Sequence, residues 1–236
     1  MMWQLSENKN KLAVIDESGG QYTYDELFEA GKKLIGHVKN GRCLVFILCT
    51  NEVGSLLGYI TFLNHRIVPV LVDANLSRDL LNSLILTYKP DYLWLPEAII
   101  GDFVAFDSIY TTHSFALVKT PFNKEFRLHD DLALLLTTSG STGSPKLVRQ
   151  SYANIKANTE SIIEYLQIDA SERPITTLPM SYTYGLSIIN THLYAGASII
   201  LTQKTLMQKE FWQQFKDFSA TSFGGVPYVY EMLDKL

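Results

Sequence analysis

Short, continuously apolar runs alternate with longer stretches whose apolar residues recur at helical spacing, and this alternation constrains the fold most strongly. Residues 44–48 (LVFIL) and 68–72 (VPVLV) are two such runs, and residues 51–63 between them indicate a helix capped by Asn51. Strands that are apolar on both faces and joined through helices are typical of a parallel sheet covered by helices on both sides. The sequence therefore predicts an α/β protein with largely parallel sheets.

The same alternation extends over most of the chain. Thr23 and Glu26 have the spacing of a capping box, in which each side chain satisfies the other residue's backbone N–H, so a helix is predicted to begin there. Further strands are predicted at residues 92–95, 132–136, 175–178, 198–201 and 220–223. Further helices are predicted at residues 77–88, 151–166, 186–194 and 207–218. Between residues 99 and 129 the periodicity fades, and no element is assigned there.

Composition and charge narrow the classes of function. The chain has 236 residues, of which 47% are apolar and 19% are charged, so it can bury a large core. Its 20 basic and 24 acidic residues leave a formal net charge of −4, which gives the whole chain no attraction to nucleic acid or to anionic membranes. No signal peptide and no uncharged apolar run of 18 residues is recognisable. We therefore expect small-molecule chemistry and no membrane span, and the oligomeric state stays open.

The positions of the two cysteines indicate the redox compartment in which the protein works. Cys43 and Cys49 flank one predicted strand, where residues rise about 3.3 Å each, so their backbones would lie roughly 20 Å apart. That distance is far beyond the reach of a disulfide. Both residues are therefore interpreted as reduced, buried thiols, which fits a cytoplasmic protein.

The most specific segment is residues 137–146 (TTSGSTGSPK), which directly follows a predicted buried strand. Gly140 and Gly143 let the backbone turn so that successive N–H groups face one concavity, hydroxyl groups add donors, and Lys146 adds a positive charge. These groups suit a polyphosphate. The segment is not a Walker P-loop, because Leu147 follows the lysine where Ser or Thr is required. Composition alone leaves a hydroxyl-rich surface turn as the alternative.

Residues 138–146 resemble the signature loop of the adenylate-forming superfamily, which includes acyl-CoA synthetases, adenylation domains of peptide synthetases and firefly luciferase. Leu147 stands where the family usually has a glycine. Further segments are similar to motifs of that family and occur in the same order: residues 22–27 (YTYDEL), 130–133 (DDLA), 178–186 (LPMSYTYGL) and 225–227 (GVP).

The resemblance implies a ligase in which a carboxylate attacks the α-phosphorus of ATP, forming an acyl-adenylate and pyrophosphate. It implies Mg²⁺ as a cofactor and, in many members, coenzyme A or a carrier thiol as the acyl acceptor. The nucleotide phosphates would lie on Thr138, Ser139, Gly140, Ser141, Thr142, Gly143 and Lys146. Lys146 and Thr138 would be the catalytic groups, with Thr138 also a Mg²⁺ ligand. The carboxylic acid would lie near Tyr182, Tyr184, Gly185 and Gly225.

The resemblance also indicates the class of substrate and how much of a family member this chain represents. Residues 179–185 contain no acid, whereas peptide-synthetase domains usually place an aspartate near this motif, so an acyl or aryl carboxylate is expected. The later Y-G-x-T-E motif of the family is missing, and a helix starting at Pro227 meets no termination signal. Residues 1–236 are thus expected to be an incomplete N-terminal domain, inactive alone, without the C-terminal domain. A non-catalytic nucleotide-binding module and a purely structural fragment remain as alternatives.

Overall fold

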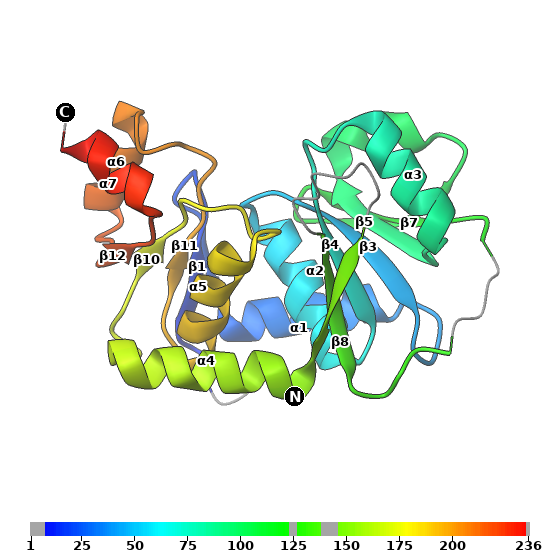
Figure 1. The fold of residues 1–236 in the computed structure, drawn as a ribbon, viewed down its shortest axis with the longest axis horizontal. Coiled ribbons are helices and arrows are strands. Elements are labelled where there is room, and N and C mark those ends of the chain that lie inside the picture. Colours follow the sequence, from blue (N-terminus) through cyan, green and yellow to red (C-terminus); the bar gives the residue numbers. More distant parts are fainter. Residues whose placement is uncertain (1–7, 123–126, 138–145, 235–236) are drawn as a thin grey trace.

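The computed structural model describes residues 8–122, 127–137 and 146–234. In this part of the chain two β-sheets lie on either side of a layer of helices (Figure 1). The larger sheet has seven strands in the order β6-β7-β5-β3-β4-β8-β9, and the smaller has five in the order β12-β10-β11-β1-β2. The predicted α/β class is confirmed.

Each sheet has a group of parallel strands, which antiparallel strands flank on both sides in the large sheet and on one side in the small sheet. In the large sheet the parallel strands are β3 (Leu44–Cys49), β4 (Val68–Asp73), β5 (Tyr92–Pro96) and β8 (Leu132–Thr137). Its antiparallel strands are β6 (Asp107–Thr112), β7 (Phe115–Lys119) and β9 (Leu147–Ser151). In the small sheet β1 (Leu12–Ile15), β10 (Pro174–Ile175), β11 (Ile199–Ile200) and β12 (Ser222–Phe223) are parallel, and β2 (Gln21–Thr23) is antiparallel.

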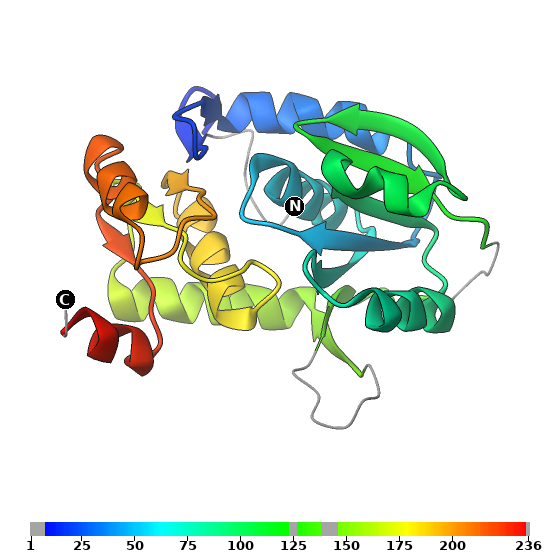
Figure 2. The same ribbon diagram turned by 90° about the horizontal axis from the view of Figure 1, so that it is seen from above.

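Helices cover both faces of each sheet. Between the sheets lie α1 (Tyr24–Ile35), α2 (Val53–Asn64) and α5 (Thr183–Tyr194), and α4 (Tyr152–Leu166) extends from the large sheet to the small one (Figure 1, Figure 2). The outer face of the large sheet carries α3 (Arg78–Tyr88) and the 3₁₀ helix η1 (Glu97–Phe103), and that of the small sheet carries α6 (Lys209–Asp217). The last element is α7 (Pro227–Leu233).

The apolar runs of the sequence fill two cores at once. In β3, Val45 and Ile47 point into the core between the sheets, whereas Leu44, Phe46 and Leu48 point into the core beneath α3. A strand buried on both faces needs this continuous pattern. Helix α2 is buried from Val53 to Leu63, which explains why it is apolar on all sides.

The capping box at the start of α1 is confirmed, because the Thr23 backbone N–H donates to Glu26 at 2.7 Å and the Glu26 N–H donates to the Thr23 hydroxyl at 3.2 Å. The predicted cap of α2 is wrong. Glu52 occupies the capping position, but its side chain accepts from the Thr50 hydroxyl and makes no capping hydrogen bond to the helix, and the Asn51 amide instead donates to the Leu178 carbonyl at 3.3 Å.

Four antiparallel strands, β2, β6, β7 and β9, and the parallel strand β1 are absent from the sequence prediction. The β6–β7 hairpin lies in the stretch that was left unassigned, and β9 lies between the predicted loop and the next helix. Both cysteines are free and buried, as predicted. Burial raises the pKa of Cys43 to about 12 and also raises the pKa of Cys49. None of the helices in the described ranges is long and apolar enough to cross a bilayer.

Candidate functional site

The predicted phosphate loop connects β8 to β9, two strands that pair antiparallel. Thr137 pairs with Leu147 and Leu136 with Val148, so the two ends of the loop are held side by side. Because β8 also pairs parallel with β4, the loop leaves the large sheet where its parallel strands end. Open α/β sheets bind ligands outside the carboxyl ends of their strands, so the loop lies where such a ligand is expected.

Most of the loop residues assigned from the sequence lie outside the described residues, namely Thr138, Ser139, Gly140, Ser141, Thr142 and Gly143. Their contacts with phosphate and with Mg²⁺ therefore stay predictions. Lys146 is described, and it lies exposed directly before β9, beside the end of β8. The lysine thus lies at the end of the β8–β9 pair from which the loop extends.

Two arginines that sequence reasoning missed fix the start of β8. The Arg42 guanidinium donates to the carbonyls of His129, at 3.1 Å, and Leu132. The Arg66 guanidinium donates to the Asp130 carbonyl at 2.6 Å. Both arginines come from connections that precede a parallel strand, Arg42 before β3 and Arg66 before β4. Charge-assisted hydrogen bonds are stronger than neutral ones, so this clamp positions the strand that carries the loop.

The second motif, residues 178–186, forms the entry into α5. Tyr182 occupies the capping position and is 50% exposed, and Tyr184 in the first turn is 39% exposed. Gly185 is buried, and a Cβ atom there would lie 2.3 Å from the Pro179 carbonyl oxygen. Glycine is therefore required for α5 to pack closely on the preceding backbone. Its predicted contact with the substrate stays a prediction.

Helix α5 forms one wall of a mainly apolar cavity of about 560 Å³. Tyr184, Ile188 and His192 line it from three successive turns, because residues four apart lie on one helix face. The opposite walls come from α4, β10 and β12, with the side chains of Ile162, Tyr165, Leu166, Ile168, Pro174 and Phe223.

Glycines 224 and 225 differ in what they face. A Cβ atom on Gly224 would lie 2.4 Å from the Ile188 side chain, so the backbone of Gly224 forms part of the cavity wall. A Cβ atom on Gly225 would instead lie 3.1 Å from Val229 and Tyr230 of α7. Of the substrate residues predicted from the sequence, Tyr184 is the one found among the described residues that line this cavity. Gly224 also lines the cavity, but it was not predicted because the matching motif begins at Gly225.

A polar cavity of about 340 Å³ joins the strands of the loop to α5. Its walls include Leu134 and Leu136 of β8, Gln150 of β9, and Asn190 of α5. Ser187 of α5 lines both this cavity and the apolar one, so the two adjoin along one helix. The strand that carries the predicted phosphate loop and the apolar cavity are thus connected through the polar cavity beside Ser187.

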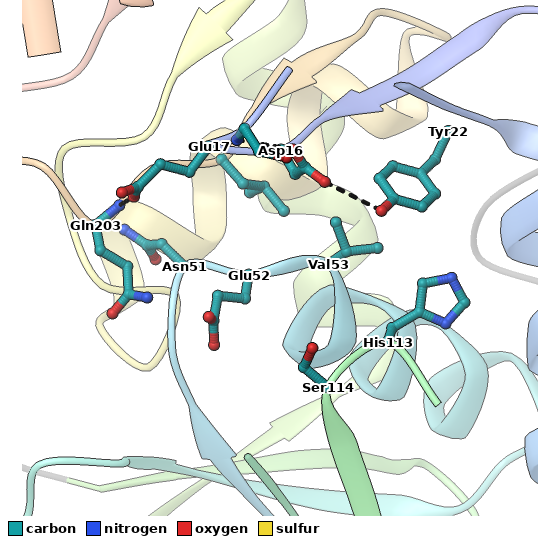
Figure 3. A pocket seen from close by; sticks show the side chains of 11 residues that line it. Asp16, Glu17, Tyr22, Asn51, Glu52, Val53, His113, Ser114 and Gln203 are labelled. Atoms are coloured by element: carbon teal, nitrogen blue, oxygen red, sulfur yellow. Dashed lines mark hydrogen bonds between the residues drawn. The ribbon is translucent and has the colours of Figure 1, made fainter. Parts of the chain in front are cut away.

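Another cavity, of about 450 Å³, lies where β1, β3 and β11 end (Figure 3). Burial raises the pKa of Asp16, but hydrogen bonds from Ser18, Gly20 and Tyr22 outweigh it and hold the pKa below its ordinary value. The Tyr22 hydroxyl donates to Asp16 at 3.0 Å, a bond drawn in Figure 3. The pKa of Glu17 is also lowered, since hydrogen bonds, led by that from the Gln203 N–H, outweigh burial. Both carboxylates therefore hold the cavity wall together.

Two curated proteins are similar to most of this chain. Peroxisomal OPC-8:0-CoA ligase 1 of Arabidopsis thaliana is 27% identical over 245 aligned residues, which cover 93% of this chain and 45% of that ligase. D-alanine--D-alanyl carrier protein ligase of Staphylococcus aureus (strain MRSA252) is 21% identical over 194 residues, covering 80% of this chain and 39% of the ligase.

Two solved structures have the same fold. Apo MatB from Rhodopseudomonas palustris superimposes with a TM-score of 0.79 at 21% identity, covering 98% of this chain and 50% of that one. MenE from Bacillus subtilis, in complex with the acyl-adenylate intermediate OSB-AMP, gives a TM-score of 0.76 at 20% identity, covering 99% of this chain and 63% of that one.

These matches cover 80–99% of this chain but only part of each relative. The chain spans about half the length of the curated relatives it matches, 45% and 39% in the two cases above. The family described as AMP-binding enzyme matches residues 1–236, the whole sequence. The resemblance found in the loop and in the later motifs is therefore confirmed, and the chain belongs to the family of AMP-binding enzymes.

Proposed function

We propose that this chain is the N-terminal part of an ATP-dependent, AMP-forming ligase that activates a carboxylic acid as an acyl-adenylate. The observation that carries the proposal is the adjacency of the loop-bearing strand β8 and the apolar cavity, which adjoin through Ser187. Acyl activation needs the nucleotide phosphates and the acid side by side in a site that excludes water from the reactive anhydride. This arrangement supports that requirement.

ATP and Mg²⁺ are the proposed cofactors. MatB has been solved with ATP bound, and MenE with ATP and a magnesium ion. In the part of the chain that the structure describes, no three His, Cys, Asp or Glu side chains group together as a metal site. The Thr138 hydroxyl, with oxygens of the nucleotide, is the donor set proposed here, and hard oxygen ligands suit Mg²⁺. Bound Mg²⁺ would neutralise charge on the phosphates.

The chain's own residues have distinct proposed roles. Backbone N–H groups and hydroxyls of residues 138–143 would hold the phosphates, and Lys146 would stabilise charge on the leaving pyrophosphate. Tyr182 and Tyr184, at the start of α5, would orient the carboxylate, with Gly225 close by. The acyl group would occupy the apolar cavity, which favours an acyl or aryl acid over an α-amino acid.

The acyl acceptor and the location are finer proposals. The names of the two curated relatives refer to a CoA ligase and to a carrier-protein ligase, which supports coenzyme A or a carrier thiol as the acceptor. The cytoplasm remains the proposed location, although the Arabidopsis relative is named as peroxisomal.

Titration of ATP·Mg²⁺ into residues 1–236 tests the proposal, with Lys146→Ala compared with the unmodified chain. The variant is expected to bind at least about tenfold more weakly, because a hydrogen bond to a charged group contributes about 1.5–3 kcal/mol. Lys119→Ala is the matched control, since Lys119 is an exposed lysine on β7, which three strands separate from β8. Equal affinity for both chains would refute the loop as a phosphate site.

The same experiment separates the alternatives. A purely structural fragment would bind no nucleotide, whereas a non-catalytic module would bind it and remain without activity even in a longer chain. Because this chain spans about half of its relatives, we expect no carboxylate-dependent ATP–pyrophosphate exchange from residues 1–236. Exchange by this chain alone would show that the remaining half of the relatives is not needed for the first step.

A further inference from the structure

The apolar cavity runs along α5 and ends on a single buried histidine. Tyr184 and His192 both line the cavity and are eight residues apart, which separates their backbones by about 12 Å along the helix. Tyr184 lies at the end nearest the substrate motif, and His192 lies at the far end, beside Glu172. His192 is only 6% exposed, so its ring belongs to the wall of the cavity.

The hydrogen bonds of His192 fix which ring nitrogen carries the proton. Nδ1 lies 2.8 Å from the Ile188 carbonyl oxygen, and a carbonyl can only accept, so Nδ1 donates. Burial lowers the pKa of His192, against smaller opposing effects of this hydrogen bond and of the Glu172 carboxylate. The ring is therefore neutral near pH 7, and Nε2 is an acceptor.

This acceptor has no partner within the described part of the chain. Among the described residues, the His192 ring forms hydrogen bonds through Nδ1 alone, and its partners are the Ile188 carbonyl and the Thr191 hydroxyl. The neighbouring polar groups already have partners, since Glu172 accepts from the hydroxyls of Thr221 and Ser222. An acceptor left unpaired in an apolar site destabilises any complex in which a methyl group covers it.

We propose that His192 selects carboxylic acids whose far end carries a hydrogen-bond donor, such as a terminal hydroxyl group. The inference rests on the proposed function, because it takes the carboxylate to lie at the Tyr184 end of the cavity. A terminal hydroxyl donates to Nε2 and satisfies it, whereas a terminal methyl of the same length leaves it unpaired. His192 is then a specificity-determining residue for the acyl group.

Equilibrium binding of two acids with the same number of chain atoms tests this selection. Undecanoic acid ends in a methyl group, and 10-hydroxydecanoic acid ends in a hydroxyl group at the same position. Isothermal titration of each acid into residues 1–236 is expected to show tighter binding of the hydroxy acid. His192→Phe removes the acceptor and is expected to reduce this preference about tenfold, because one satisfied hydrogen bond in an apolar site changes affinity by about that factor.

Two further variants separate selection from a general effect on folding. His192→Gln keeps a side-chain carbonyl oxygen and is expected to retain most of the preference for the hydroxy acid. His37→Phe makes the same change at an exposed histidine that stacks on Tyr110, and is expected to leave the preference unchanged. Thermal melting of each variant checks that it folds. If His192→Phe does not fold, His192→Leu and His192→Gln are compared instead. The proposal then requires that His192→Leu loses the preference for the hydroxy acid and that His192→Gln retains it.

Each outcome has a defined meaning. An unchanged preference in folded His192→Phe would overturn the role of His192 while leaving the cavity as the acyl site. Failure of both acids to bind the unmodified chain would overturn the cavity as an acyl site, and with it this inference. The ATP·Mg²⁺ titration with Lys146→Ala would still test nucleotide binding independently, so the two failures are distinguishable.

Discussion

Replacing Gly185 by alanine tests whether the start of α5 is fixed by close packing on the preceding backbone. Helix propensity alone favours the change, because alanine in a helix is about 1 kcal/mol better than glycine. The structure predicts the opposite sign. The new Cβ atom would lie 2.3 Å from the Pro179 carbonyl oxygen and 2.9 Å from the Leu178 carbonyl oxygen. Neither oxygen belongs to a side chain that can rotate away.

The expected magnitude follows from these opposing effects. Overpacking a filled site costs about 1–3 kcal/mol, and this site lies at the upper end, about 2–3 kcal/mol, because the Asn51 amide holds the Leu178 carbonyl at 3.3 Å and limits relaxation of the segment. After the gain in helix propensity, Gly185→Ala is expected to lower the free energy of unfolding by about 1–2 kcal/mol. For a chain of this size that corresponds to a fall in Tm of about 2–8 °C.

Urea unfolding followed by circular dichroism measures this difference. Gly101→Ala is the matched control, because Gly101 also lies in a helical segment, η1, and a Cβ atom there has no heavy atom within 4 Å. The control is expected to be unchanged or slightly stabilised. If Gly185→Ala is as stable as the unmodified chain, the packing argument for this glycine is wrong.

Two further predictions concern the first hairpin and helix. Thr23→Ala removes the hydroxyl that accepts from the Glu26 N–H and donates to the Glu26 carboxylate, and it leaves the bond from the residue 23 backbone N–H in place; it is expected to lower the free energy of unfolding by about 1 kcal/mol, measured by thermal melting. Thr23→Ser should retain most of that stability, and equal melting of all three chains would contradict the capping role. The pKa of Asp16 is below its ordinary value of 3.8, so the stability from its ionised form is present above pH 3.8 and is lost as the pH falls through the lower, folded-state pKa. Asp16→Asn is therefore expected to show a shallower loss of stability in acid, and parallel pH profiles from urea unfolding would refute this.

Four strands of the large sheet were predicted well because they are apolar runs buried on both faces, although the buried strands β1 and β7 were missed. The strands β3, β4, β5 and β8 are apolar on both faces, so their runs stand out without any knowledge of their partners. The missed strand β9 pairs with β8 alone and is half-exposed, and β6 is likewise an edge strand with exposed residues. Edge strands lack a second neighbour to demand apolar side chains, so their sequences carry no clear pattern.

In the candidate site, residues within a local motif could be predicted from the sequence, whereas residues placed by contacts distant in the sequence could not. The wrong assignment of Asn51 as a cap arose because its amide bonds to Leu178, 127 residues later in the chain, and no local pattern encodes that contact. Tyr184 could be identified because it lies within a contiguous motif. Ile188 and His192 could not, because the cavity that they line is assembled from α4, β10, α5 and β12.

The course of the chain after the loop has a mechanical consequence. Strand β9 ends at Ser151, and α4 begins at the next residue and continues for 15 residues, about 22 Å, to Leu166 in the wall of the apolar cavity (Figure 1). Because Ser151 pairs with Leu132, α4 begins at the end of β9 that lies away from the loop, so β9 and α4 join the loop to the cavity wall as two rigid elements in series. A ligand at the loop that shifts β9 and α4 together would change the affinity of the cavity for its own ligand. By thermodynamic reciprocity, occupation of the cavity changes affinity at the loop by the same factor.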